Sequence, residues 1–153
     1  MDLILWRHAE AEDADGEIAD LERRLTRRGE KQAKRVARWL LAHLPPRRRV
    51  LVSPAMRTRQ TADALGTAYE IEPRVSPGAT AREVLLAAGL PKNKEAVLVV
   101  GHQPCLGEVA SLLLAGTEDG LSVRKGAIWW FSHRGPGEPG LPFLRSVIDP
   151  EQL

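Results

Sequence analysis

The five residues from Ala96 to Val100 are all apolar and form a segment of strand length. Successive side chains of a strand point to opposite faces of the sheet, so a run without alternation buries both faces. Such a strand belongs in the centre of a sheet that is covered above and below. This segment therefore predicts an α/β domain with helices on both faces of a mostly parallel sheet.

Strand-like and helical patterns alternate along the rest of the chain. The predicted strands are residues 3–6, 50–52, 96–100, 127–131 and 143–148, and the predicted helices are residues 26–44, 55–65, 80–88 and a segment after Pro104. Thr26 is a suitable N-cap for the first helix, which Pro45-Pro46 stops. Thr80 and Glu83 have the spacing of a capping box. The Gly/Pro-rich turn at residues 135–140 predicts an antiparallel hairpin at the end of the sheet.

Length and composition favour one soluble domain. The chain has 153 residues, of which 43% are hydrophobic, so residues 1–153 can bury one core. The net charge of +2 does not favour nucleic-acid binding, and no apolar run approaches the ~18 residues of a membrane span. We interpret the acidic residues at positions 10–22 and the basic ones at 23–38 as a loop and the solvated face of a helix. The single cysteine suits a reducing compartment, and we expect a cytoplasmic protein.

Polar residues follow three of the predicted strands directly. Arg7-His8 follows the first strand, Ser53-Pro54 the second, with Arg57 shortly after, and Gly101-His102 follows the central strand. In open α/β sheets, ligands bind outside the carboxyl ends of the strands. We therefore expect these side chains to converge on one rim of the sheet and to form a binding site.

The residues at these strand ends have the chemistry that phosphoryl transfer requires. A neutral imidazole can attack phosphorus, and His8 is suited to this role. Arg7 and Arg57 can neutralise the phosphoryl oxygens with paired donors, and their charges disfavour the imidazolium form of His8. His102 can donate to the same group from another direction. An Arg-His pair alone is common by chance, so the hypothesis depends on the four residues together.

Four segments together resemble the histidine phosphatase superfamily. They are Leu5-Trp6-Arg7-His8-Ala9, the stretch from Leu25 to Ala33, the run from Ser53 to Ala62, and Val100-Gly101-His102-Gln103-Pro104. Within this family the short chain is similar to the phosphohistidine phosphatases of the SixA type. The resemblance implies a three-layer phosphoglycerate mutase-like fold with an antiparallel edge, a covalent phosphohistidine intermediate, and no metal or other cofactor. By position, it makes His8 the nucleophile, Arg7 and Arg57 the phosphate clamp and His102 the second histidine, while Ser53 either lines the pocket or caps the following helix.

Two features depart from the family pattern. Ala9 stands where the family usually has glycine after the nucleophile, and we expect the one added methyl group to be tolerated. The general acid that larger members use to protonate an alkoxide is not evident. Glu83 is a candidate, although a capping box with Thr80 explains it without catalysis. Glu10 and Asp13, in the loop after His8, are further candidates.

The unassigned acid bears on the choice of substrate. A phosphorylated imidazole leaves more readily than an alkoxide, so the sequence favours a phosphatase that removes phosphate from phosphohistidine in proteins. One alternative is a phosphatase of small phosphate esters that uses Glu83 or a loop carboxylate as the acid. The other is a non-catalytic module that binds phosphate or a phosphoprotein, with the basic helix around residues 27–38 as its docking face. The sequence does not predict the oligomeric state.

Overall fold

The computed structural model describes residues 1–133 and 142–153 of the chain. The elements are β1 (Asp2–Arg7), η1 (Asp20–Glu22), α1 (Arg27–His43), β2 (Arg48–Val52), α2 (Met56–Asp63), β3 (Glu70–Ile71), η2 (Pro73–Val75), α3 (Ala81–Ala87), β4 (Ala96–Gly101), α4 (Cys105–Ala115), β5 (Ile128–Ser132), β6 (Phe143–Ile148) and η3 (Pro150–Gln152). In these two ranges, no helix has both the length and the apolar character that crossing a membrane requires.

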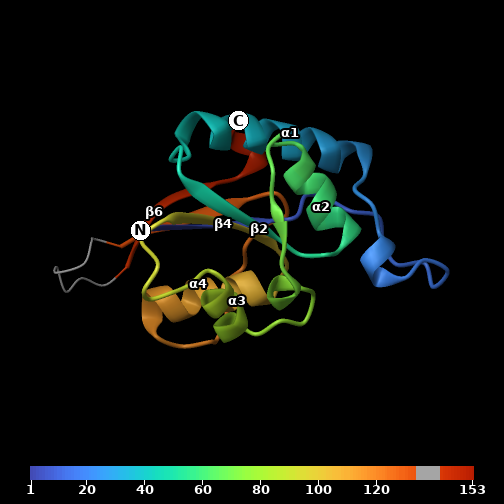
Figure 1. Cartoon of the computed structure of the whole chain (residues 1–153). Coiled ribbons are helices and arrows are strands. Elements are labelled where there is room, and N and C mark those ends of the chain that lie inside the picture. Colours follow the sequence, from blue (N-terminus) through green and yellow to red (C-terminus); the bar gives the residue numbers. More distant parts are fainter. Residues whose placement is uncertain (134–141) are drawn as a thin grey trace.

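The strands form one mixed sheet in the order β3-β2-β4-β1-β5-β6. The pairs from β3 to β1 are parallel, and β5 and β6 add an antiparallel edge. Every residue of β4 is buried, because α1 and α2 cover one face of the sheet and α3 and α4 the other (Figure 1). The predicted α/β class, the buried central strand and the antiparallel edge are confirmed.

Local sequence signals set the helix ends. The Thr26 side chain accepts a hydrogen bond of 3.0 Å from the Gly29 amide, so it caps α1 as predicted. Thr80 and Glu83 form a reciprocal capping box at the start of α3. Each cap satisfies amide groups that a helix leaves without partners in its first turn.

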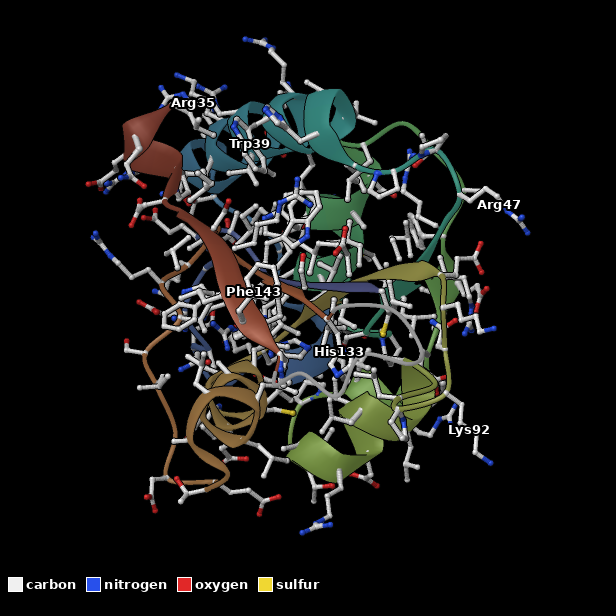
Figure 2. The ribbon with its side chains drawn as sticks, turned by 90° about the vertical axis from the view of Figure 1, so that its left-hand side faces the viewer. Arg35, Trp39, Arg47, Lys92, His133 and Phe143 are labelled. Atoms are coloured by element: carbon white, nitrogen blue, oxygen red, sulfur yellow. The ribbon has the colours of Figure 1, made fainter. Side chains whose placement is uncertain are left out.

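The structure adds elements at the sheet edges that the sequence patterns did not predict. Strand β3 is only two residues long, and both are exposed, so it has no apolar pattern to detect. The predicted turn at residues 135–140 lies outside the described residues, although the strands on either side of it are antiparallel. Near this edge, Trp39 of α1 packs edge-on against Trp130 with ring centroids 6.1 Å apart, while Phe143 of β6 is exposed (Figure 2).

The first turn of α1 packs closely against the loop that follows β1. A Cβ atom added at Gly29 would lie 1.9 Å from the carbonyl oxygen of Glu10, a backbone atom that cannot move independently. Alanine normally stabilises a helix interior over glycine, by about 1 kcal/mol. We expect Gly29→Ala to lower the free energy of unfolding instead, by about 1–3 kcal/mol, because of this overlap. Urea unfolding measures the sign, and a more stable variant would contradict the packing described.

Candidate functional site

The carboxyl ends of three neighbouring strands meet at one edge of the sheet. Trp6 of β1 and Val52 of β2 both pair with Val100 of β4, so the three strands end at the same level. The ladder continues past the strands, because the His8 amide donates to the Gly101 carbonyl oxygen at 3.1 Å. The structure therefore brings together the strand-end residues that the sequence analysis singled out.

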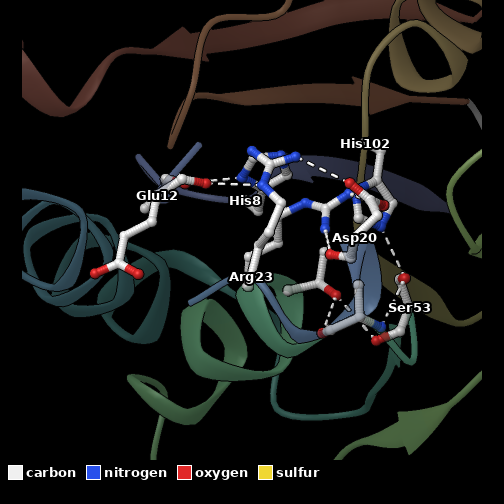
Figure 3. Close-up of polar contacts among 10 residues, drawn as sticks. His8, Glu12, Asp20, Arg23, Ser53 and His102 are labelled. Atoms are coloured by element: carbon white, nitrogen blue, oxygen red, sulfur yellow. Dashed lines mark hydrogen bonds and ion pairs between the residues drawn. The ribbon is translucent and has the colours of Figure 1, made fainter. Parts of the chain in front are cut away.

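The imidazole ring of His8 has a defined orientation at this edge. Its Nδ1 atom lies 2.7 Å from the carbonyl oxygen of Ala9, which can only accept a hydrogen bond. Nδ1 is therefore the protonated nitrogen of the neutral ring, and Nε2 carries the lone pair. The centroid of the His102 ring is 5.4 Å from that of His8 (Figure 3).

Burial keeps both rings neutral at physiological pH. Desolvation is the largest cause that lowers the pKa of His8, to about 4, and the charges of Arg57, Arg7 and Arg23 lower it further, while the hydrogen bond to Ala9 opposes them. Desolvation also lowers the pKa of His102 to about 3, with Arg57 the next cause. The lone pair on Nε2 of His8 is thus available without a separate base.

Ser53 lies behind His102, fully buried. Its Oγ atom is 2.8 Å from Nε2 of His102 and accepts the Ala55 amide at 3.2 Å. The hydroxyl group can either donate to Nε2 or accept from it, and in the first case the ring proton of His102 lies on Nδ1. Ser53 contacts His102 and also caps the turn that follows β2, while its role in binding substrate stays a prediction.

Arg7 and Arg57 reach the same region from different elements. Nη1 of Arg7 donates to the Val123 carbonyl oxygen at 3.0 Å. Arg57, in the first turn of α2, donates from Nη1 to the Asp20 carbonyl oxygen at 2.7 Å and from Nη2 to Oδ2 of Asp20 at 3.2 Å. Desolvation lowers the pKa of both guanidinium groups, although the charge of Asp20 opposes this at Arg57.

Several buried nitrogen atoms of this site have no hydrogen-bond partner. In the described part of the chain they are Nε of Arg7, Nε of Arg57 and Nδ1 of His102. Buried donors are seldom left unpaired in proteins, because each one costs free energy. The two arginine donors, together with Nδ1 of His102 when it is protonated, suit an anion with several oxygen atoms beside His8.

The remaining residues of the quoted segments fix the chain just after His8. The Ala9 amide donates to Oγ1 of Thr61 at 3.1 Å, and the Glu10 amide donates to Oε1 of Gln32 at 3.0 Å. Thr26 and Gly29 contact Glu10 as well. No described residue other than glycine has a positive φ, so Ala9 is tolerated where the family usually has glycine.

The predicted candidates for a general acid have other partners or are exposed. Oε2 of Glu83 accepts the Thr80 amide at 2.8 Å in the capping box. Oε1 of Glu10 accepts from Thr26 at 2.9 Å, and Oε2 lies 3.6 Å from Arg28. Asp13 is exposed in the loop. None of these contacts tests the role of an acid, which stays a prediction.

Sequence reasoning missed two residues of the site, Asp20 and Arg23. Asp20 lies in the acidic stretch that we interpreted as a loop, and Arg23 begins the basic stretch that we interpreted as the solvated face of a helix. Asp20 instead binds both Arg57 and Arg23. Hydrogen bonding to Arg23 is the largest cause that lowers the pKa of Asp20, so its carboxyl group is ionised. No period or motif marks this contact, because it depends on how the loop folds back onto α2.

Other groups near the site have little capacity for metal or thiol chemistry. Over residues 1–133 and 142–153, no three His, Cys, Asp or Glu side chains form a group that could hold a metal ion. Cys105 lies three residues after His102 and is buried, and desolvation raises the pKa of its thiol to about 12. The Cys105 thiol therefore stays protonated at physiological pH, which disfavours it as a nucleophile.

Comparisons with known proteins agree with this geometry. A sequence model of the histidine phosphatase superfamily (branch 1) matches residues 3–96. An uncharacterized protein of Mycobacterium tuberculosis is 35% identical over 125 residues, which make up 77% of each chain. Phosphohistidine phosphatase SixA of Escherichia coli is 30% identical over 124 residues, 76% of each chain. The structure of the protein histidine phosphatase SixA complexed with tungstate superimposes with a TM-score of 0.81 at 27% identity, covering 99% of both chains.

Stability should depend on pH through the two histidines. Both have a folded pKa below the ordinary value of about 6.5, so the unfolded chain binds their protons first as the pH falls. The free energy of unfolding should therefore decrease between pH ~6.5 and pH ~4, by a few kcal/mol. Urea unfolding of the wild type and of His8→Asn at several pH values measures this. An equal slope in the two proteins would show that His8 does not contribute.

Proposed function

Because this chain belongs to the histidine phosphatase superfamily, we propose that it is a phosphatase that removes phosphate from phosphohistidine in proteins through a covalent intermediate on His8. The orientation of the His8 ring carries this proposal. Its Nδ1 proton is held by the Ala9 carbonyl oxygen, so the nucleophilic lone pair resides on Nε2. The alignment with two SixA proteins at 30% identity supports the choice of substrate.

In the first step, Nε2 of His8 attacks phosphorus and forms a P–N bond. The P–N bond of the substrate breaks, and its electron pair goes to the nitrogen of the leaving imidazole. The other ring nitrogen of this imidazole carries a proton, so the ring departs neutral. In this proposal the unpaired donors of Arg7 and Arg57 bind the equatorial oxygen atoms, and Nδ1 of His102, when protonated, supplies another donor. Such donors stabilise charge on the transferring group without an added metal.

In the second step, water attacks phosphorus and the bond to His8 breaks. The electron pair of that bond returns to Nε2, one proton of the attacking water passes to a phosphoryl oxygen atom, and inorganic phosphate leaves. The low pKa of His8 favours this step, because the ring leaves as a neutral imidazole that does not need a proton. The low pKa of His8 thus keeps the lone pair free for the first step and also assists the second step.

The carboxylates near the site support phosphohistidine over an ester. Asp20 is ionised and bonded to two arginines, and Glu83 serves in a helix cap. An alkoxide leaving group needs a proton from a neutral acid, whereas a phosphorylated imidazole leaves with less assistance. The imidazole leaving group therefore suits a site whose carboxylates are ionised or held in a helix cap.

The surroundings of Arg7 support a substrate larger than a small ester. A groove of about 260 Å³ lies beside Arg7, and its walls include Glu10, Arg28 and Lys125. A groove that shares a residue with the phosphoryl site can hold the chain that carries a phosphohistidine. Its charged walls favour a polar surface over an apolar ligand.

The covalent step predicts a phosphoryl group on His8. Incubation with phosphoramidate or a phosphohistidine peptide should give an acid-labile adduct of one phosphoryl group in the wild type. His8→Asn keeps a side-chain donor near the Ala9 carbonyl oxygen but has no nucleophile, and we expect no adduct and a loss of turnover of at least about 10³-fold. His43→Asn, at an exposed helix end, is the matched control. Intact-mass spectrometry detects the adduct, and release of phosphate measures turnover. Normal turnover by His8→Asn would contradict the mechanism.

The choice of leaving group predicts how Glu83→Gln behaves. The amide cannot donate a proton as an acid but keeps an oxygen for the Thr80 amide. We expect turnover of a phosphohistidine peptide within about twofold of the wild type. The small-ester phosphatase would instead be favoured by two results together. The wild type would hydrolyse phosphate esters faster than the peptide, and Glu83→Gln would lose most of its turnover of these esters. Binding of the peptide without turnover in the wild type would favour the non-catalytic module.

A further inference from the structure

A third guanidinium group, that of Arg23, lies at the His8 site. Its charge acts on His8 together with those of Arg7 and Arg57, and it also acts on Arg57. Figure 3 shows Arg23 and Asp20 beside the two histidines. The proposed phosphoryl-transfer mechanism does not use Arg23.

Two hydrogen bonds hold the Arg23 side chain in place. Its Nε atom donates to the Glu12 carbonyl oxygen at 2.7 Å, and Nη1 donates to Oδ1 of Asp20 at 3.0 Å. The other carboxylate oxygen of Asp20 accepts from Arg57 at 3.2 Å. Asp20 therefore joins the two guanidinium groups and fixes their separation, while the second proton of Nη1 and both protons of Nη2 stay available on Arg23.

The cluster of Arg7, Arg23, Arg57 and Asp20 has more positive than negative charges. Arg7, Arg23 and Arg57 together carry three positive charges, and in the portions of the chain that the structure covers only the Asp20 carboxylate is bonded to any of them. Three like charges near a buried histidine repel one another. Their net charge of two positive units after Asp20 matches the two negative charges of a phosphoryl group.

We propose that Arg23 is a third phosphoryl-binding residue of the His8 site and that Asp20 is a positioning residue that holds Arg23 and Arg57 around the same anion. This inference rests on the proposed function of His8. Arg23 binds the phosphoryl oxygen atoms directly with its free donors. Asp20 acts through the two arginines and does not touch the substrate.

The neighbouring arginine provides a matched control. Arg24 is exposed, and its backbone carbonyl oxygen accepts the Glu12 amide, a contact that a side-chain substitution keeps. Arg23→Gln and Arg24→Gln therefore remove the same charge from adjacent positions of one loop. If Arg23 acts only through general electrostatic attraction, the two substitutions should weaken anion binding equally. If Arg23 contacts the anion directly, only Arg23→Gln should weaken binding strongly.

Equilibrium binding of inorganic phosphate to the full chain, measured by isothermal titration calorimetry, tests the role of Arg23. We expect Arg23→Gln to weaken binding about tenfold and Arg24→Gln less than twofold, with Arg23→Lys between them. The ring pKa of His8, followed by NMR, should rise in Arg23→Gln. Equal binding by Arg23→Gln and Arg24→Gln, at unchanged melting temperature, would overturn the inference. No binding to the wild type would instead overturn the phosphoryl site itself.

The role of Asp20 has a test that depends on sign. Asp20→Asn removes a negative charge from an anion site, so electrostatics alone predicts tighter phosphate binding. Loss of positioning predicts weaker binding, and no further loss when Arg23→Gln is added, because both changes act through the same side chain. Tighter binding by Asp20→Asn, or fully additive losses in the double variant, would show that Asp20 does not position Arg23.

Discussion

The shared register of β2, β4 and β1 is the constraint on which the rest of the site depends. Backbone hydrogen bonds fix where these three strands end, so the residues that follow them lie close together once the sheet has formed. The ladder even includes His8, through its bond to the Gly101 carbonyl oxygen. His8, the proposed nucleophile, is thus positioned by the most buried part of the sheet, while the loops around it supply charge.

The site combines two features that lower stability but favour the proposed chemistry. Arginine side chains are placed in a partly desolvated region, and two histidines are buried beside them. Both features disfavour the folded state of an empty pocket at low pH, and both favour a neutral ring and a bound anion. Among the surrounding polar side chains, Thr61 and Gln32 accept the Ala9 and Glu10 amides and so hold the chain that follows His8.

Sequence reasoning reached the parts of this structure that depend on local patterns. The buried strand, the caps at Thr26 and Thr80, and the strand-end positions of His8 and His102 follow from neighbours in the chain. The contacts of Asp20 and Arg23 did not follow, because Arg57, which Asp20 binds, is 37 residues away and the path of the loop has no period. The short strand β3 escaped for a related reason, since two exposed residues pair only because β2 presents a free edge.

The burial of Cys105 has a consequence for oxidative stress. Phosphatases that use a thiolate lose activity when peroxide oxidises it, because thiolates react much faster than thiols. Here the single cysteine of the chain is buried and its thiol pKa is about 12, so it stays protonated. The chemistry proposed for His8 should therefore persist in a cell whose cysteine-dependent phosphatases have been inactivated.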